Sequence, residues 1–387
     1  MDLALCPVAP GDVVDSPRVT VTADGRRVKT VDGVPWGAGS LSNGVHRGAS
    51  LSDILQDLLV PENIQRENKK HNFDVIDGID LESIYVELEG ADIAPEETLL
   101  KSTLGYAAGL PLTYVLDPAN QVLLSYAMNG EALTPAHGAP LRAVAPGQIG
   151  ARSVKWLVKV TLLAQPSSSY FMQQDYKHFP PNVLPKYAEC ERGAYCQLSD
   201  AVYAAGVPFT SLNVQLAVTK PASATTNIVG SDGPVGIAAG APLEVEGFAF
   251  SGGGAAAQAV YLCLLPEGEP LSWCDTRGWT AALLTPAAVP LRLPTGTPTT
   301  SNWAWTFWKA TLPLDGGVVR AGEYRVVARA VDTGNQHMPE NICPIYSWRG
   351  VLNNAWFKLP VIAHEKKGAL EEKHLLDLDE ASRPHRY

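Results

Sequence analysis

A basic stretch interrupted by glycine and proline, within residues 137–155, carries the residue types that bind oxyanions. It contains His137, Arg142, Arg152 and Lys155. Glycine lets a backbone approach a ligand closely, and guanidinium and ammonium groups donate hydrogen bonds to phosphate or another oxyanion. The stretch therefore predicts a phosphate-clamping loop. The alternative interpretation is a pair of surface hairpins whose charges are simply solvated.

Short strands and turns are expected to position this loop. Apolar and β-branched runs predict strands at 18–23, 83–88, 121–127, 141–144 and 154–163. Turn formers such as Asn129–Gly130 separate these runs. The leucine spacing over 50–59 predicts a helix that is capped by a serine and ended by Pro61. Residues 61–80 are polar and charged, which favours an exposed loop. The first part of the chain is thus expected to be of mixed α+β type.

The second half has a different pattern, with short strands and almost no helical periodicity. The predicted strands lie at 214–219, 243–250, 259–265, 303–312 and 322–331. Gly, Pro and Thr punctuate these runs, and this is typical of a β-sandwich. We therefore divide the chain into residues 1–210, residues 211–362 and a charged tail at 363–387.

Composition excludes several classes of protein. The 387 residues are 46% hydrophobic and 18% charged, which is incompatible with disorder of the whole chain. A formal net charge of −10 argues against a general nucleic-acid partner, because phosphate attraction needs a basic surface. The sequence also predicts no membrane span and no secretory signal. The six cysteines form no zinc pattern, so reduced thiols are expected, with a bridge between Cys190 and Cys196 as the alternative.

An ordered series of motifs resembles a known family. Residues 33–55, 123–162 and 165–179 resemble the molybdopterin domain of eukaryotic sulfite oxidases and of their relatives, the assimilatory nitrate reductases. The motifs of the second half resemble the immunoglobulin-like dimerisation domain of the same family, and they lie at 214–221, 247–254, 303–308, 328–340 and 347–359. The resemblance implies an α+β molybdopterin domain followed by an all-β immunoglobulin-like sandwich that forms a homodimer through residues 211–362.

The resemblance also implies which residues hold the cofactor. In this family the molybdenum cofactor, Mo-molybdopterin, is a pyranopterin that ends in a phosphate. The matching positions here are His137, Arg142, Arg152, Ser153 and Lys155. The basic loop would therefore grip the phosphate.

The substrate pocket is implied by another set of positions. Trp36, Tyr170 and Arg349 match the family's oxyanion pocket, and Arg27 is a further candidate. Sulfite oxidases carry an arginine at the position of Arg349, whereas nitrate reductases usually carry an apolar residue. Sulfite is therefore the expected substrate and a nitrate-type reaction the alternative. Taken singly, the two aromatic residues are more typical of a core or an interface, and the arginine of a surface charge.

The sequence departs from the family at the metal ligand. The family binds molybdenum through one cysteine, and Thr22 stands at that position here. A threonine hydroxyl does not replace a soft thiolate. Cys6 is a weaker candidate, because its flanking residues do not match the motif, and no metal ligand is assigned. We expect an N-terminally incomplete form of an active enzyme, with a catalytically inactive dimerising homologue as the alternative.

The remaining expectations concern partners and location. No cytochrome b5-like haem module is recognised, so cytochrome c or oxygen is expected to accept the electrons released from sulfite. Mitochondria are favoured over peroxisomes and cytoplasm, since the sequence ends in His385-Arg386-Tyr387 rather than in a peroxisomal signal.

Overall fold

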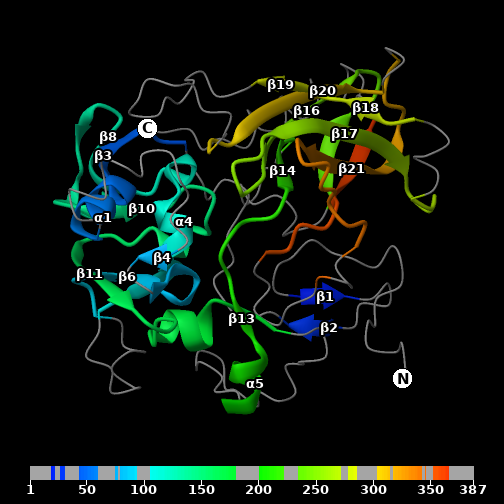
Figure 1. Cartoon of the computed structure of the whole chain (residues 1–387). Helices are drawn as coiled ribbons and strands as arrows, with labels where there is room; N and C mark the ends of the chain where they lie inside the picture. Colours follow the sequence, from blue (N-terminus) through cyan, green and yellow to red (C-terminus); the bar gives the residue numbers. More distant parts are fainter. Residues whose placement is uncertain are drawn as a thin grey trace, which may run out of the picture.

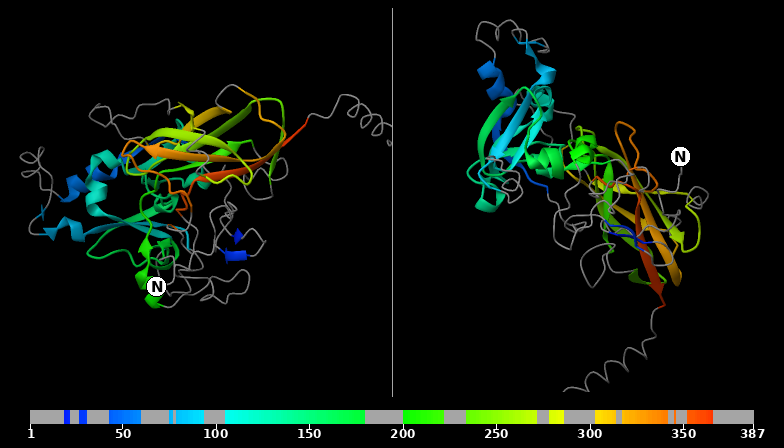
Figure 2. Two further views of the ribbon diagram at one scale, coloured as in Figure 1. Left: turned by 90° about the vertical axis from the view of Figure 1, so that its right-hand side faces the viewer. Right: turned by 90° about the horizontal axis from the view of Figure 1, so that it is seen from below.

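The computed structural model describes the chain in two bodies, which lie side by side in Figures 1 and 2. The described side chains belong to residues 43–59, 80–93, 105–179, 203–221, 234–271, 278–285, 303–313, 317–341, 345 and 352–365. The backbone is also described at 19–21, 27–30, 75–76, 79 and 200–202.

The first body is built from two small sheets and two helices. One sheet has the order β10–β8–β3 with β9 beside β8, and the other has the order β11–β6–β7. The elements are β3 (His46–Ser50), α1 (Leu51–Leu59), β6 (Tyr85–Gly90), β7 (Ala107–Pro111), α4 (Leu112–Leu116), β8 (Leu123–Met128), β9 (Glu131–Ala132), β10 (Arg142–Val144) and β11 (Leu157–Leu163). Helix α1 packs on α4, where Ser52 Oγ donates to the carbonyl of Leu116 at 2.7 Å. Leu51, Leu88 and Leu110 belong to the shared core.

Shorter elements connect these sheets and lead to the second body. Strands β1 (Val19–Val21) and β2 (Arg27–Thr30) pair, as do β4 (Val75–Ile76) and β5 (Ile79–Asp80), and β12 (Lys177–His178) and β13 (Val207–Pro208). The remaining turns and helices are η1 (Leu81–Ser83), η2 (Pro118–Asn120), η3 (Pro135–His137), η4 (Gly150–Arg152), the π-helix η5 (Phe171–Asp175) and α5 (Asp200–Ala205).

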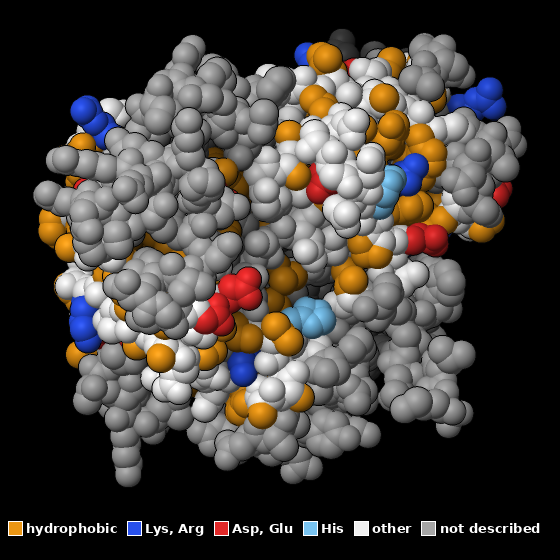
Figure 3. Space-filling view, viewed as in Figure 1, with side chains coloured by type: hydrophobic (Ala, Val, Ile, Leu, Met, Phe, Trp, Pro, Cys, Tyr) orange, Lys and Arg blue, Asp and Glu red, His pale blue; other side chains and the backbone are white. Residues whose placement is uncertain are grey.

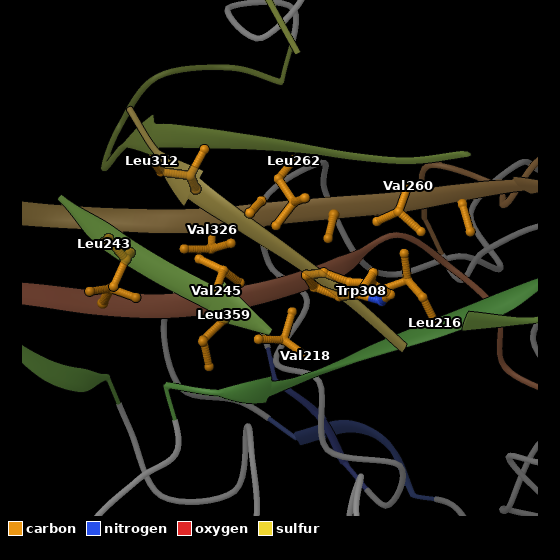
Figure 4. Packing of buried hydrophobic residues seen from close by; sticks show 14 of the residues in the cluster. Leu216, Val218, Leu243, Val245, Val260, Leu262, Trp308, Leu312, Val326 and Leu359 are labelled. Carbon is orange, nitrogen blue, oxygen red and sulfur yellow. The ribbon is translucent and has the colours of Figure 1, made fainter. Parts of the chain in front are cut away.

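The second body is a β-sandwich. One sheet has the order β14–β16–β20–β19 and the other β15–β22–β21–β17–β18. Its strands are β14 (Gln215–Lys220), β15 (Val235–Ala238), β16 (Leu243–Phe250), β17 (Ala257–Pro266), β18 (Thr280–Ala281), β19 (Leu283–Thr285), β20 (Thr306–Leu312), β21 (Gly322–Asp332) and β22 (Phe357–His364). Figure 4 shows the labelled apolar side chains of the two sheets pointing toward one another. Val245, Leu262 and Leu359 are fully buried there, because alternate residues of each strand face the partner sheet.

The two bodies contact each other through the loop that follows β10. A Cβ atom on Gly147 would lie 2.4 Å from the ring of Trp303, so only glycine allows this approach. The backbone N–H of Leu212 donates to the carbonyl of Gly147 at 3.1 Å. Asn43, just before β3, exchanges two hydrogen bonds with the backbone of Trp305, at 2.8 and 3.0 Å. The second body therefore contacts the chain just before β3 and just after β10, which are the two outer strands of the order β10–β8–β3.

The expected fold class is confirmed, and α1 occupies the helix predicted over 50–59. Sequence reasoning missed β7 and α4, because the segment Ala107–Leu116 is apolar without a clear period. It also missed β22, whose Pro360 is unusual inside a strand.

Several expectations fall outside the described residues. These are the possible Cys190–Cys196 bridge, most of the 61–80 loop and the tail beyond residue 365. The limits 1–210 and 211–362 remain predictions. None of the described helices is long and apolar enough to cross a membrane.

The sandwich core gives a stability prediction. Leu262 on β17 is 0% exposed, whereas Leu283 on β19 is 62% exposed. We expect Leu262→Ala to lower the free energy of unfolding by about 2–5 kcal/mol, because it leaves a cavity. Leu283→Ala is the matched control and should change this free energy by less than about 0.5 kcal/mol. Urea unfolding measures both, and equal effects would contradict the two-sheet packing.

Candidate functional site

The basic loop surrounds one glycine. Gly138 follows the short helix η3 and has φ of +100°, in the left-handed region. A Cβ atom there would lie 2.9 Å from Cβ of Lys155 and 3.1 Å from Cβ of Arg142. Glycine is thus required twice, for the backbone conformation and for the close approach. This packing brings His137, Arg142 and Lys155 together, and we call these three residues the anion cradle.

Arg142 is the half-buried charge of the anion cradle. Its Nη1 donates to the carbonyl of His137 at 3.1 Å, and its Nη2 donates to the carbonyl of Ser153 at 3.2 Å. Burial lowers the pKa of Arg142 from its ordinary value, yet an arginine stays charged at neutral pH. Among the described residues, no carboxylate oxygen lies within 4.0 Å of a side-chain nitrogen of the anion cradle. The positive charge therefore lacks a counter-ion in the described part of the chain.

Lys155, the third member of the anion cradle, contacts the backbone of Ala136 and the ring of Trp156. Lys155 Nζ lies 3.1 Å from the carbonyl of Ala136, to which it donates, and 4.3 Å from the centre of the Trp156 ring. Trp156 has φ of +50°, and its Nε1 donates to the carbonyl of Pro135 at 2.8 Å. Such a backbone conformation costs about 1–2 kcal/mol for a non-glycine residue. The hydrogen bond and the cation–π contact help to offset that cost.

Ser153 is available as a hydrogen-bond donor. Its Oγ accepts the backbone N–H of Ala145 at 3.0 Å, which leaves the hydroxyl proton free to point elsewhere. The residue is half-buried and directly precedes the buried Val154. The hydrogen bond from Ala145 thus fixes the position of the Ser153 hydroxyl, which can still donate its proton to an anion.

Arg152 has a different environment from the anion cradle. It is 0% exposed, and its nitrogens donate to the carbonyls of Phe209 (2.6 and 2.9 Å), Phe171 (3.2 Å) and Tyr176 (3.4 Å). Burial, the largest influence, lowers the pKa of Arg152 to about 10, so it remains charged at neutral pH. Because its donors are directed at the protein's own backbone, this environment favours a positioning role for Arg152.

Tyr170 lies next to this buried guanidinium. The residue is 9% exposed and directly precedes the π-helix η5, whose first carbonyl, that of Phe171, accepts from Arg152. The Tyr170 and Phe171 rings meet edge-on with centroids 5.3 Å apart. Single-turn π-helices are frequent at functional sites. Arg152 therefore links the loop of the anion cradle to the segment of the expected substrate tyrosine.

Two supporting residues were missed by the sequence analysis. Tyr106 donates through its hydroxyl to the carbonyl of Ala151 at 2.8 Å, and its ring packs against that of Phe171 in a tilted arrangement with ring centroids 4.4 Å apart. Burial raises the pKa of Tyr106. Nδ1 of His46, on β3, lies 3.2 Å from Oγ of Ser125. Tyr106 belongs to none of the motifs named above. His46 lies within the motif at 33–55, but nothing in that motif marked it as a site residue, and the pairing of β3 with β8 brings it to Ser125.

The rest of the predicted substrate pocket lies outside the described residues. This holds for Trp36, Arg349 and the metal-ligand candidates Thr22 and Cys6, and only the backbone of Arg27 is described, in β2. The described part contains no cluster of three or more histidine, cysteine or acidic residues that could hold a metal ion. Convergence of the three pocket residues therefore remains a prediction.

Comparison with known proteins defines the class first. An oxidoreductase molybdopterin binding domain matches residues 14–171, and a Mo-co oxidoreductase dimerisation domain matches residues 207–364. The chain thus combines a domain of the oxidoreductase molybdopterin-binding type with a Mo-co oxidoreductase dimerisation domain.

Individual relatives narrow this class. The chain is 34% identical to sulfite oxidase of Gallus gallus over 334 residues, which are 86% of this chain and 58% of the relative. It is 32% identical to the mitochondrial sulfite oxidase of Drosophila melanogaster over 335 residues, 87% of this chain and 48% of the relative. It is 30% identical to sulfite oxidase of Arabidopsis thaliana over 343 residues, 86% of this chain and 70% of the relative. The chain belongs to the sulfite oxidase family, and it spans about half the length of the fly and chicken relatives.

The packing around Gly138 gives a second prediction. Gly138→Ala should displace Arg142 and Lys155, whereas Gly130→Ala has a similar φ of +86° but open space around it. We expect Gly130→Ala to cost about 1 kcal/mol of unfolding free energy from backbone strain alone. Gly138→Ala should cost more and should also lower the pterin bound per protein, measured by fluorescence after release. Equal results for the two variants would contradict the assigned packing.

The buried guanidinium gives a third prediction. Arg152→Met leaves the carbonyl of Phe209 and those of the π-helix segment without a donor. Unfolding free energy should fall by about 3–5 kcal/mol, because each unsatisfied buried acceptor costs about 1–3 kcal/mol. Arg47→Met, at an exposed arginine on β3, is the control and should be nearly neutral. Urea unfolding measures both variants. An unfolding free energy of Arg152→Met equal to that of the wild type would refute the positioning role of Arg152.

Proposed function

We propose that this chain is a molybdenum-cofactor oxidoreductase that oxidises sulfite to sulfate. The observation that carries the proposal is the anion cradle, whose half-buried Arg142 has no carboxylate partner among the described residues. Because the chain belongs to the sulfite oxidase family, the expected ligand of this charge is the phosphate at the end of a pyranopterin. The donors fit that group, because guanidinium, ammonium and imidazole are the side chains that bind phosphate in proteins.

The residues of the chain would divide the work as follows. His137, Arg142, Ser153 and Lys155 would bind the phosphate end of the pyranopterin, while Arg152 would hold the loop in place. Tyr170, Trp36, Arg349 and Arg27 would orient sulfite. The cofactor, when bound, would supply the redox chemistry, in which sulfite and water become sulfate, two protons and two electrons. An external acceptor such as cytochrome c or oxygen would take the electrons.

Fixed charge explains why such a site suits sulfite. A sulfite dianion leaves water only where directed donors and permanent positive charge replace its hydration. Arg349 would provide that charge as a planar fork, and the hydroxyl of Tyr170 would provide a donor. A nitrate-type enzyme would be expected to carry an apolar residue in place of Arg349. Nitrate is therefore the second candidate substrate, after sulfite.

Assembly and location are part of the proposal. The dimerisation domain supports a homodimer formed through residues 211–362. A mitochondrial location is supported by the fly relative, which is a mitochondrial sulfite oxidase. No nucleic-acid or membrane partner is proposed. Among the residues described on the face in Figure 3, Lys and Arg side chains are scattered singly rather than gathered into a basic patch.

The decisive experiment measures cofactor content and activity together. Protein from a host that makes the molybdenum cofactor is assayed for bound pterin, for molybdenum, and for sulfite-dependent reduction of ferricyanide or cytochrome c. We expect all three, with Arg142→Gln lowering pterin content at least tenfold relative to the exposed-site control Arg47→Gln. Reduction of nitrate but no oxidation of sulfite would favour the nitrate-type enzyme. Pterin without molybdenum would favour the inactive homologue, for which Thr22 at the metal-ligand position is the motivating residue.

A further inference from the structure

His46 lies on the same face of the sheet as the anion cradle. The central strand β8 pairs with β3 on one side and with β10 on the other, and Ser125 is directly opposite Arg142. Directly paired residues of antiparallel strands project their side chains to one face. His46 reaches this face from β3, since its Nδ1 is 3.2 Å from Oγ of Ser125. Ser125 thus stands between His46 and the cradle arginine.

The hydrogen-bond partners of Ser125 favour one tautomer of His46. Ser125 Oγ lies 3.1 Å from the carbonyl of Ala127 and 3.2 Å from the carbonyl of Arg47, and it is completely buried. A hydroxyl has a single proton, and a carbonyl can only accept, so two carbonyl neighbours favour a proton directed at one of them. In that arrangement Ser125 accepts from Nδ1–H of His46, and the neutral imidazole carries its lone pair on Nε2.

The surroundings keep this imidazole neutral. Burial, the largest influence, lowers the pKa of His46, and the positive charge of Arg142 and the neighbouring imidazole of His137 lower it further. Met128, opposite His46 in β8, is uncharged, and no described carboxylate forms an ion pair with His46. Its Nε2 has no hydrogen-bond partner among the described residues. At neutral pH, His46 is therefore an uncharged base that contacts Ser125, the residue paired with Arg142.

We propose that His46 is a fourth member of the anion cradle, and that binding of a phosphate group there is coupled to uptake of one proton at Nε2 of His46. The proton comes from solvent, and no other bond is made or broken. A dianion among Arg142, His137 and Lys155 replaces the repulsion felt by a charged imidazole with attraction. The protonated Nε2–H can then donate to the phosphate. The identity of this phosphate as that of a pyranopterin rests on the proposed function, whereas the protonation itself does not.

The coupling has a defined sign. The bound state holds one more proton than the free state, so rising pH weakens binding between the two titration midpoints. For a single proton, the limit is a tenfold rise in the dissociation constant per pH unit. The measured quantity is the difference between the wild-type chain and a His46 variant, so that any other pH-dependent contribution cancels.

Nuclear magnetic resonance of the histidine rings tests protonation directly. The full-length protein is prepared without cofactor, and the ring signal of His46 is identified by its absence in His46→Phe. With inorganic phosphate at tens of millimolar, the titration midpoint of His46 should rise by at least one pH unit, while that of the exposed His364 on β22 stays fixed. An unchanged midpoint for His46, whether or not phosphate perturbs the other cradle signals, would overturn the proposal.

Cofactor retention gives a second, independent measurement. Holo-protein is passed through gel filtration at pH 6 and pH 8, and the remaining pterin is measured by fluorescence. The wild type and the control His364→Phe should lose more pterin at the higher pH, whereas His46→Gln should show a smaller difference. Glutamine can still bond Ser125 but does not titrate, which guards against misfolding. The same pH dependence in His46→Gln and wild type would overturn the role of His46, while wild-type protein without pterin at either pH would instead refute the proposed function.

Discussion

A guanidinium that is shut off from water must find its hydrogen-bond acceptors inside the protein, and the acceptors of Arg152 in the described part of the chain are backbone carbonyls. The carbonyls of Phe171, Tyr176 and Phe209 come from two separate segments, and η4 supplies the arginine itself. Losing any of these contacts would leave a buried charge or carbonyl unsatisfied, which is costly in a low-dielectric interior. The loop of the anion cradle and the segment after Tyr170 are therefore held in one fixed relation.

The second body extends this constraint to the whole sheet. Trp303 packs on Gly147, in the loop that joins β10 to η4, and Trp305 bonds to Asn43 at the entrance of β3. Both tryptophans come from one short segment of the sandwich, and Phe248 and Phe250 pack against the Trp305 ring. A domain expected only to join two copies of the chain thus also braces the strands that carry the anion cradle.

Local charge and overall charge have opposite signs in this protein. The chain has a formal net charge of −10, yet the anion cradle concentrates positive groups where no described carboxylate neutralises them. Burial strengthens the effect, because the field of a half-buried arginine is less screened than that of a surface charge. Burial lowers the pKa of His46, and the charge of Arg142 lowers it further, so both favour an uncharged imidazole.

Residue types and their order were sufficient to predict the family, the succession of an α+β domain and a β-sandwich, and one basic loop that contains His137, Arg142 and Lys155. That this loop binds an anion stays a prediction. These features depend on local chemistry, since glycine, proline and basic side chains act over short spans of chain. The burial of Arg152 and the approach of His46 to Ser125 depend instead on long-range contacts, which join residues 57 and 79 positions apart. No periodicity encodes such pairs, and only the pairing of strands and the packing of the two bodies decided them.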